Sequence, residues 1–197
     1  WTVMIAGLRA LDVGPTVASS WLGIAAYLTL AGALTAWSAA RRSRTGRAFL
    51  PLAAALVLAL DDFHVWATGG LETMLYALLA TSGVLATRGA LGLRRALGAG
   101  LLLALCMLTR PDGALFAAAG IASPWIGAGG RDGSEKLRLS LAVALPVVLL
   151  NGAHLAWKLA YYGEVLPTAF YAKSTTDPWF SQGLFYLGLL ARRNWFL

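Results

Sequence analysis

The chain of 197 residues is too apolar for an ordinary soluble domain. Hydrophobic residues make up 58% of it and charged residues 13%, whereas soluble domains contain about 45–50% apolar residues with Gly included and about 25% charged residues. Too few charges are present to cover the surface of a globule of this size. The composition therefore indicates that lipid, and not water, surrounds much of the chain. It predicts an all-α, polytopic transmembrane bundle.

The length fits one transmembrane domain, residues 1–197, with about six to seven membrane or juxtamembrane helices. The net charge of +7 comes from short basic runs between apolar stretches and not from a stripe interleaved with aromatics, which argues against nucleic acid as a partner. The lone cysteine, Cys106, excludes a disulfide or a multi-cysteine metal site built within this chain. The chain opens at Trp1 without a signal peptide, and we expect an internal fragment of a longer protein.

Apolar runs alternate with short polar segments along the chain. The first span is expected over 17–40 and ends at a basic run that begins with Arg41. The chain is then expected to cross over 49–60 to Asp61-Asp62, and to return over 71–87 after a break at Gly69-Gly70. Further crossings are expected over 96–109, 114–126 and 139–160, followed by an outer loop over 161–182 and a helix over 184–197.

Basic residues give this arrangement an orientation. Ten of the 16 Lys and Arg residues fall in three loops on one side: Arg41, Arg42, Arg44, Arg47, Arg88, Arg94, Arg95, Arg131, Lys136 and Arg138. Loops on the other side hold only Arg110, Lys158 and Lys173. Because Lys and Arg in short loops mark the cytoplasmic side, the second side is predicted to be extracytoplasmic.

An acidic pair and a histidine fall on the predicted outer side. Asp61-Asp62 directly follows an apolar run, and His64 comes two residues later. Two carboxylates could bind a divalent cation or a sugar hydroxyl, but with one imidazole they do not define a metal site. Solvated charges that end a helix are the alternative interpretation, and we predict no metal ligand here.

Gly69-Gly70-Leu71-Glu72-Thr73 predicts a break followed by a new helix, with Glu72 in its first turn. A carboxylate there is stabilised by the helix dipole without any further role. The same helix start could instead receive an anion or a polar sugar beside glycines that permit a close approach. Both interpretations remain open.

Arg110-Pro111-Asp112-Gly113 has the composition of a turn between two helices. Arg110 lies apart from the inner basic loops, so its guanidinium could hold a phosphate in a bidentate manner. It could also pair with Asp112 or Glu72. Further along, an aromatic segment ends in Lys173 and fits either an interfacial aromatic belt or a surface that stacks on sugars and neutralises a lipid phosphate.

Three of these segments, in this order and spacing, resemble bacterial GT-C glycosyltransferases. They are Gly70-Leu71-Glu72-Thr73, Arg110-Pro111-Asp112-Gly113, and Tyr161-Tyr162-Gly163 with Leu166-Pro167 and Phe170-Tyr171-Ala172-Lys173. More narrowly, the chain resembles the group that includes the mycobacterial terminal arabinofuranosyltransferase. One departure is Pro167-Thr168-Ala169, which stands where that group often has Pro-Asn-Thr.

The resemblance implies a glycosyltransferase of the bacterial plasma membrane with its active face outside. It implies transfer of a sugar, with arabinofuranose as one candidate, from a polyprenyl-phosphate donor to a cell-envelope glycan or a lipid-linked acceptor. No cofactor is firmly implied, and a role for a divalent cation is left open. Membrane lipids are the other expected partners. The competing function is a transporter or flippase, although the sequence contains no paired repeat of the kind such proteins often use.

The resemblance implies only that certain residues line the site, and the expected chemistry of transfer assigns their roles. The residues carried over are Glu72, Arg110, Asp112, Tyr162, Tyr171 and Lys173. The principal catalytic Asp is expected upstream of Trp1, so this fragment alone is expected to be inactive, and the candidates within it are Glu72 and Asp62. Phosphate contacts are assigned to Arg110 and Lys173. The predicted substrate-binding residues, with His64 added from the outer acidic cluster, are Arg110, Asp112, His64, Tyr162, Tyr171 and Lys173.

Overall fold

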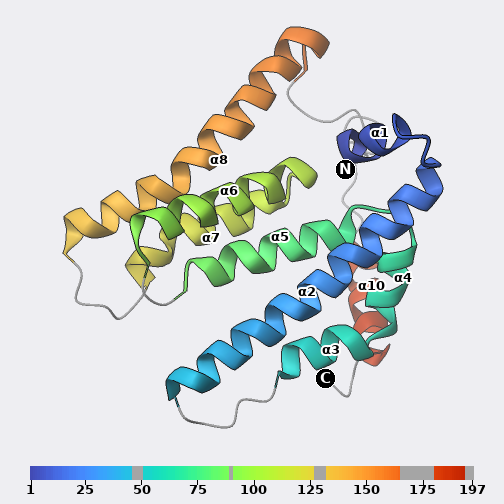
Figure 1. Cartoon of the computed structure of the whole chain (residues 1–197), viewed down its shortest axis with the longest axis horizontal. Helices are drawn as coiled ribbons and strands as arrows, with labels where there is room; N and C mark the ends of the chain where they lie inside the picture. The colour runs from blue at the N-terminus through green and yellow to red at the C-terminus, as the bar shows by residue number, and fades with distance from the viewer. Residues whose placement is uncertain (46–50, 89–90, 127–131, 165–179, 194–197) are drawn as a thin grey trace. The chain divides into compact units, whose positions relative to one another are not determined.

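A computed structural model describes residues 1–45, 51–88, 91–126, 132–164 and 180–193, and among these residues all regular structure is α-helical (Figure 1). The helices are α1 (Thr2–Arg9), α2 (Pro15–Thr45), α3 (Leu52–Ala59), α4 (Asp61–Thr68), α5 (Thr73–Ala86), α6 (Leu93–Thr109), α7 (Gly113–Ile126), α8 (Gly133–Tyr162) and α10 (Phe180–Arg193). The chain divides into two units, Trp1–His154 and Leu155–Leu197, and α8 runs through the boundary between them.

Two helices are long and apolar enough to cross a membrane by themselves, Pro15–Ala40 within α2 and the whole of α8. A third span results if α4 and α5 count as one, although the two are bent by 117°. A crossing takes about 20 residues, and α7 has 14. The prediction of an all-helical chain is therefore confirmed for the described residues, which contain two or three candidate membrane spans.

The structure corrects the expected crossing over 49–60. Residues 46–50 lie outside the described residues, and α3 covers only eight residues, about 12 Å of helix. Leu60 is extended, with ψ of 121°, and the chain restarts as α4 with Asp61 and Asp62 in its first turn. The acidic pair therefore begins a helix and does not follow the end of a crossing. Carboxylates there are favoured by the free N–H groups and by the helix dipole.

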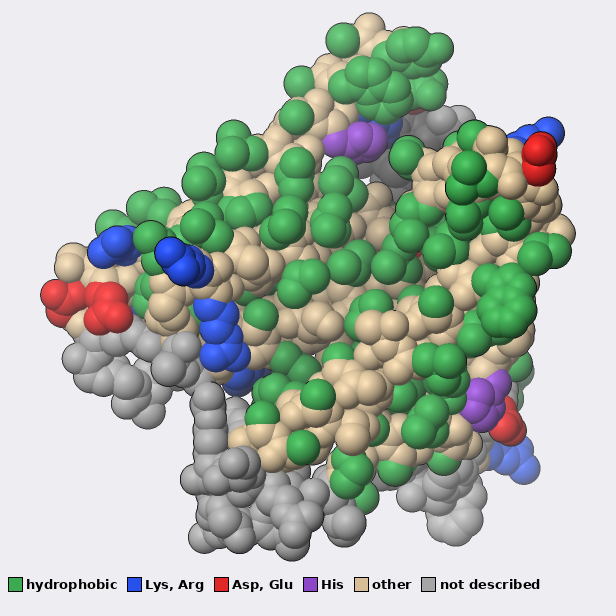
Figure 2. Space-filling view, in the orientation of Figure 1, with side chains coloured by type: hydrophobic (Ala, Val, Ile, Leu, Met, Phe, Trp, Pro, Cys, Tyr) green, Lys and Arg blue, Asp and Glu red, His purple; other side chains and the backbone are tan. Residues whose placement is uncertain are grey.

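Within the first unit, α5, α6 and α7 are neighbours, and α6 runs antiparallel to the other two (Figure 1). At one end, Tyr76 near the start of α5 contacts Arg110 in the turn between α6 and α7. At the other end, the Arg95 guanidinium donates to the Leu85 carbonyl over 3.3 Å. Figure 2 shows Lys and Arg side chains gathered where α6 and α8 begin. The arginine-proline turn therefore lies beside the start of α5, at the end opposite to Arg95.

Glycines allow these helices to approach closely around Leu103, which is fully buried on α6. A Cβ atom at Gly83 of α5 would lie 2.7 Å from the Leu103 side chain, and one at Gly120 of α7 would also collide with it. Because interiors pack without spare volume, the two glycines make the space that this leucine fills. The centre of the unit is thus the contact of α5, α6 and α7.

The N-terminus of α8 is capped by Asp132. Its Oδ1 accepts hydrogen bonds from the Glu135 backbone N–H at 2.7 Å and from the Ser134 hydroxyl at 3.0 Å. Both bonds favour the charged carboxylate, so they hold the pKa of Asp132 below its usual value. The cap satisfies one of the donors that every helix start leaves free.

A lowered pKa predicts how the first turn of α8 responds to pH. The stabilisation by Asp132 is fully present above the unfolded value of about 3.9 and is lost as the pH falls through the lower folded value. Hydrogen exchange at the Glu135 amide, corrected for its intrinsic pH dependence, should therefore accelerate below about pH 4. Asp132→Asn keeps a capping oxygen but cannot titrate, so its corrected profile should be flat. Equal profiles for the wild-type protein and Asp132→Asn would contradict the role of Asp132 as the titrating cap of α8.

The second unit contains the end of α8 and α10. Helix α8 extends to Tyr162 and α10 begins at Phe180, so both ends of the range predicted as an outer loop, 161–182, are helical. Residues 165–179 between them lie outside the described residues.

Candidate functional site

The break between α4 and α5 depends on Gly70, as the double glycine predicted. Its φ is +73°, a left-handed conformation that side chains rarely adopt. A Cβ atom at this position would also lie 2.9 Å from Ser19 Oγ on α2. One residue further along α2, the Ser20 hydroxyl donates to the Thr68 carbonyl at 3.2 Å. These contacts hold the end of α4 against α2 while α5 departs at 117°.

A groove of about 510 Å³ lies along α5, between α4 and α7. Its walls are mainly apolar and consist of Asp62, Phe63, Trp66, Thr73, Met74, Tyr76, Ala77, Ala80, Thr81, Val84, Leu85 and Phe116. The members on α5 recur every three or four residues, so they form one face of that helix. From Thr73 to Leu85 this face extends for about 18 Å. The groove is therefore an elongated, mainly apolar concavity with few polar groups.

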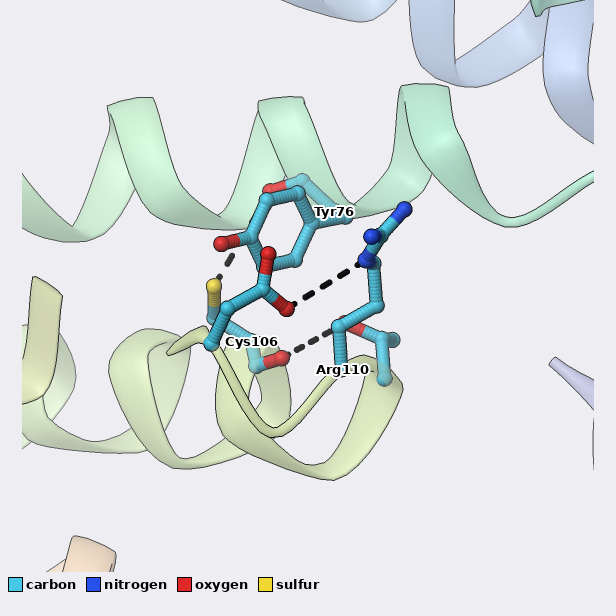
Figure 3. A network of polar contacts seen from close by, with 5 residues as sticks. Tyr76, Cys106 and Arg110 are labelled. Atoms are coloured by element: carbon cyan, nitrogen blue, oxygen red, sulfur yellow. Dashed lines mark hydrogen bonds and ion pairs between the residues drawn. The ribbon is translucent and has the colours of Figure 1, made fainter. Parts of the chain in front are cut away.

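Arg110 lies against Tyr76, one of the residues that line the groove (Figure 3). The Arg110 Nε donates to Asp112 Oδ1 at 3.3 Å, and the guanidinium carbon lies 5.4 Å from the centre of the Tyr76 ring. The ring is supported in turn by an edge contact with Phe116, with centroids 6.0 Å apart. The aromatic face and the carboxylate thus position the guanidinium from two directions.

The local sequence explains why Arg110 lies where it does. A residue before proline avoids helical dihedrals, and Arg110 is extended with φ of −147° and ψ of 136°, which ends α6 at Thr109. The chain reverses at once, because the Gly113 N–H donates to the Arg110 carbonyl at 3.0 Å. A Cβ atom at Gly113 would lie 2.8 Å from the Met107 backbone, so only glycine fits. The predicted turn is confirmed.

Arg110 keeps capacity for a ligand despite its pair with Asp112. Its side chain is 42% exposed and that of Asp112 is 51% exposed. A guanidinium has five N–H donors, and the described part of the chain provides a hydrogen-bond acceptor for the one on Nε alone. The pairing with Asp112 that the sequence allowed is present, and it leaves the terminal nitrogens open to an anion.

The first helical turn of α4 separates its two acidic residues. Asp62 lines the groove, whereas Asp61 lies 3.9 Å from His64 Nδ1. His64 packs edge-on against Tyr27 of α2, with ring centroids 5.6 Å apart, and is not among the groove residues. Among the residues that the structure describes, no three His, Cys, Asp or Glu side chains are grouped closely enough to hold a metal ion.

Glu72 is the N-cap residue of α5, so it precedes the first turn in which the sequence placed it. Its carboxylate makes no capping hydrogen bond, and the side chain is half-buried. It lies one helical turn before Tyr76, whose N–H donates to the Glu72 carbonyl at 2.9 Å. Glu72 is therefore near the polar end of the groove without lining it.

The remaining predicted residues belong to the second unit. Tyr162 is 61% exposed and forms an aromatic cluster with Trp157 and Tyr161 at the end of α8. Tyr171 and Lys173 lie outside the described residues. Of the predicted site residues, the structure thus brings Arg110 and Asp112 together beside the groove and places Asp62 in its wall.

Comparison with protein-family models, curated proteins and solved structures finds no match to this chain.

Sequence analysis did not identify Tyr76 or the groove. A signal for the groove was present, because Thr73, Ala77, Ala80 and Thr81 put small side chains on one face of an otherwise Leu-rich helix. Small residues leave room between packed helices. Tyr76 directly precedes Ala77 on α5. Its contact with Arg110 depends on the tertiary arrangement of α5 and α6, which the sequence pattern does not reveal.

Proposed function

We propose that this chain is the membrane part of a GT-C-type glycosyltransferase that takes a sugar from a polyprenyl-phosphate donor. The observation that supports this most is the apolar groove along α5, which adjoins the exposed guanidinium of Arg110 through Tyr76. A lipid-linked sugar has the matching chemistry: a long apolar chain for the groove and a phosphate for an arginine. The resemblance in sequence points to the same class of donor.

In this proposal the groove holds the first isoprenoid units and Arg110 contacts the phosphate. The acceptor hydroxyl attacks the anomeric carbon while the bond from that carbon to the phosphate oxygen breaks. The hydroxyl proton passes to a carboxylate base, and the departing lipid phosphate carries the electron pair of the broken bond. Arg110 stabilises that negative charge. Asp62, in the groove wall, and Glu72, at the start of α5, are the carboxylate candidates within the chain.

We further propose a multi-pass arrangement of six to seven membrane or juxtamembrane helices in a bacterial plasma membrane, with the Arg110 end outside. Two observations support this orientation: the basic residues at the start of α6 lie at the opposite end from Arg110, and α6 runs antiparallel to α5 and α7 (Figure 1). The acceptor would be a cell-envelope glycan or a lipid-linked glycan, and arabinofuranose is one candidate for the sugar transferred.

The decisive experiment measures transfer of labelled sugar from a polyprenyl phosphate by the full protein in lipid vesicles. Labelled glycan is the expected product. Movement of the label across the bilayer without a new glycosidic bond would instead support a flippase.

A groove-filling variant tests where the lipid chain binds. Ala77 lines the groove, so Ala77→Trp should raise the KM for a long-chain donor about tenfold, the effect of losing about 1.4 kcal/mol of apolar contact. A donor analogue with a short chain should be affected little. Ala119→Trp is the matched control, because Ala119 is exposed on α7 and does not line the groove. Equal effects of both variants would place the lipid chain elsewhere.

A further inference from the structure

A second apolar groove, of about 520 Å³, lies between the first parts of α6 and α8. It is lined by Leu93, Leu97, Arg138, Leu141, Ala142, Ala144, Leu145 and Val148. Arg138, Leu141, Leu145 and Val148 recur at intervals of three or four residues, so they lie along one face of α8 over about 15 Å. Much of this wall is open, because Leu141 is 60% exposed and Val148 is 65% exposed.

The close contact of α6 with α8 fixes the floor of this groove. Gly100 packs against the Val143 carbonyl so tightly that a Cβ atom there would collide with it. Ala96, Ala142 and Val143 are buried in the same cluster. The Asn151 amide donates to the Ala104 carbonyl at 3.3 Å and so joins the two helices again further along. The groove is therefore a fixed concavity between two packed helices.

The groove ends at a positive charge. Arg138 is the only charged residue in its lining, and within the described ranges it forms no ion pair. Arg94 is exposed on α6, three residues before Leu97, so helical geometry places it at the flank of the same groove. The Nζ atom of Lys136 lies 5.9 Å from the centre of the Trp125 ring. The acidic Asp132 next to this region is engaged in capping α8.

We propose that this groove binds an anionic phospholipid of the surrounding bilayer. One acyl chain would lie against Leu141, Leu145 and Val148, and the phosphate would meet Arg138, whose planar guanidinium can bind two phosphate oxygens. Basic pockets between membrane helices are suited to anionic head groups. The site is separate from the α5 groove and does not depend on glycosyl transfer.

The test is native mass spectrometry of the full protein titrated with phosphatidylglycerol or with phosphatidylcholine of the same acyl chains. The wild-type protein should retain phosphatidylglycerol more tightly. Arg138→Gln should weaken that binding about fivefold, the effect of one cation close to an anionic lipid surface. It should weaken phosphatidylcholine less, because the choline cation offsets the charge of the phosphate in that lipid. Arg138→Lys should keep most of the preference. Arg88→Gln is the control, because it removes an exposed charge outside the groove.

Two variants test the apolar part. Leu145→Trp fills the groove and should weaken binding of both lipids, whereas Leu137→Trp alters a residue on α8 that is 53% exposed and lies outside the groove. Equal losses in Arg138→Gln and Arg88→Gln would overturn the proposal, as would equal binding of the two lipids by the wild-type protein. A protein dimer that Leu145→Trp disrupts and that lipid does not displace would show that a second copy of the chain occupies the groove.

Discussion

Arg110→Ala is expected to lower the rate of sugar transfer about 100-fold, because removing one preorganised donor to a developing anion costs about 2.7–4 kcal/mol of transition-state stabilisation. The terminal nitrogens of Arg110 are open to a ligand, and the exposed side chain is fixed by Tyr76 and Asp112. A phosphate bound there would carry more negative charge after the sugar has left. Both kcat and the KM for the lipid donor should therefore worsen.

The variants of this pair separate a phosphate contact from a structural role. Arg110→Lys keeps the charge but loses the planar fork, so part of the activity should return. Thermal stability should change little, since exposed ion pairs contribute only about 0–1 kcal/mol. Arg88→Ala, at the far end of α5, is the matched control. If Arg110→Ala left kcat and KM unchanged in the intact protein, the phosphate contact would be excluded.

Tyr76 provides an independent measure of the same arrangement. Tyr76→Phe keeps the aromatic face beneath the guanidinium, which lies 5.4 Å from the ring centre. Tyr76→Ala removes that face and frees Arg110 to adopt other rotamers. We therefore expect Tyr76→Phe to transfer sugar at the wild-type rate. The rate of Tyr76→Ala should fall toward that of Arg110→Ala.

Most helices could be predicted from the sequence because apolar runs are interrupted where the backbone must change course. Pro111 ends α6 by restricting Arg110, and Gly113 begins α7 because only glycine fits against Met107. Gly70 makes the break before α5 through its positive φ. These are local effects, which a single sequence contains.

The prediction was wrong where a local pattern had two physical meanings. Asp61 and Asp62 after an apolar run were expected at the end of a crossing, yet carboxylates also favour the first turn of a helix, and Leu60 provides the extended residue between α3 and α4. The small side chains on one face of α5 are the only sequence signal for the groove, because its depth depends on how far α4 bends away from α5. Gly70 permits that bend, and contacts between residues far apart in the sequence, such as Ser20 with Thr68, hold it.

Gly100→Ala is expected to destabilise the first unit although alanine favours helices. At an open position, replacing glycine by alanine in a helix should stabilise by up to about 1 kcal/mol. At Gly100 the added Cβ would meet the Val143 carbonyl and lie 3.1 Å from Pro146 Cδ, and neither atom can move without shifting α8. Overpacking of this kind costs about 1–3 kcal/mol. The net effect should therefore be destabilising.

Gly98→Ala on the same helix is the matched control, because nothing lies within 4 Å of a Cβ atom there. Denaturant unfolding in detergent should give the order Gly98→Ala, wild type, Gly100→Ala from most to least stable. Since Gly100 also fixes the floor of the groove between α6 and α8, Gly100→Ala should weaken phosphatidylglycerol binding while Gly98→Ala leaves it intact. If the two variants were equally stable, α6 and α8 would not be packed through Gly100, and the α6–α8 groove would lose the contact that defines it.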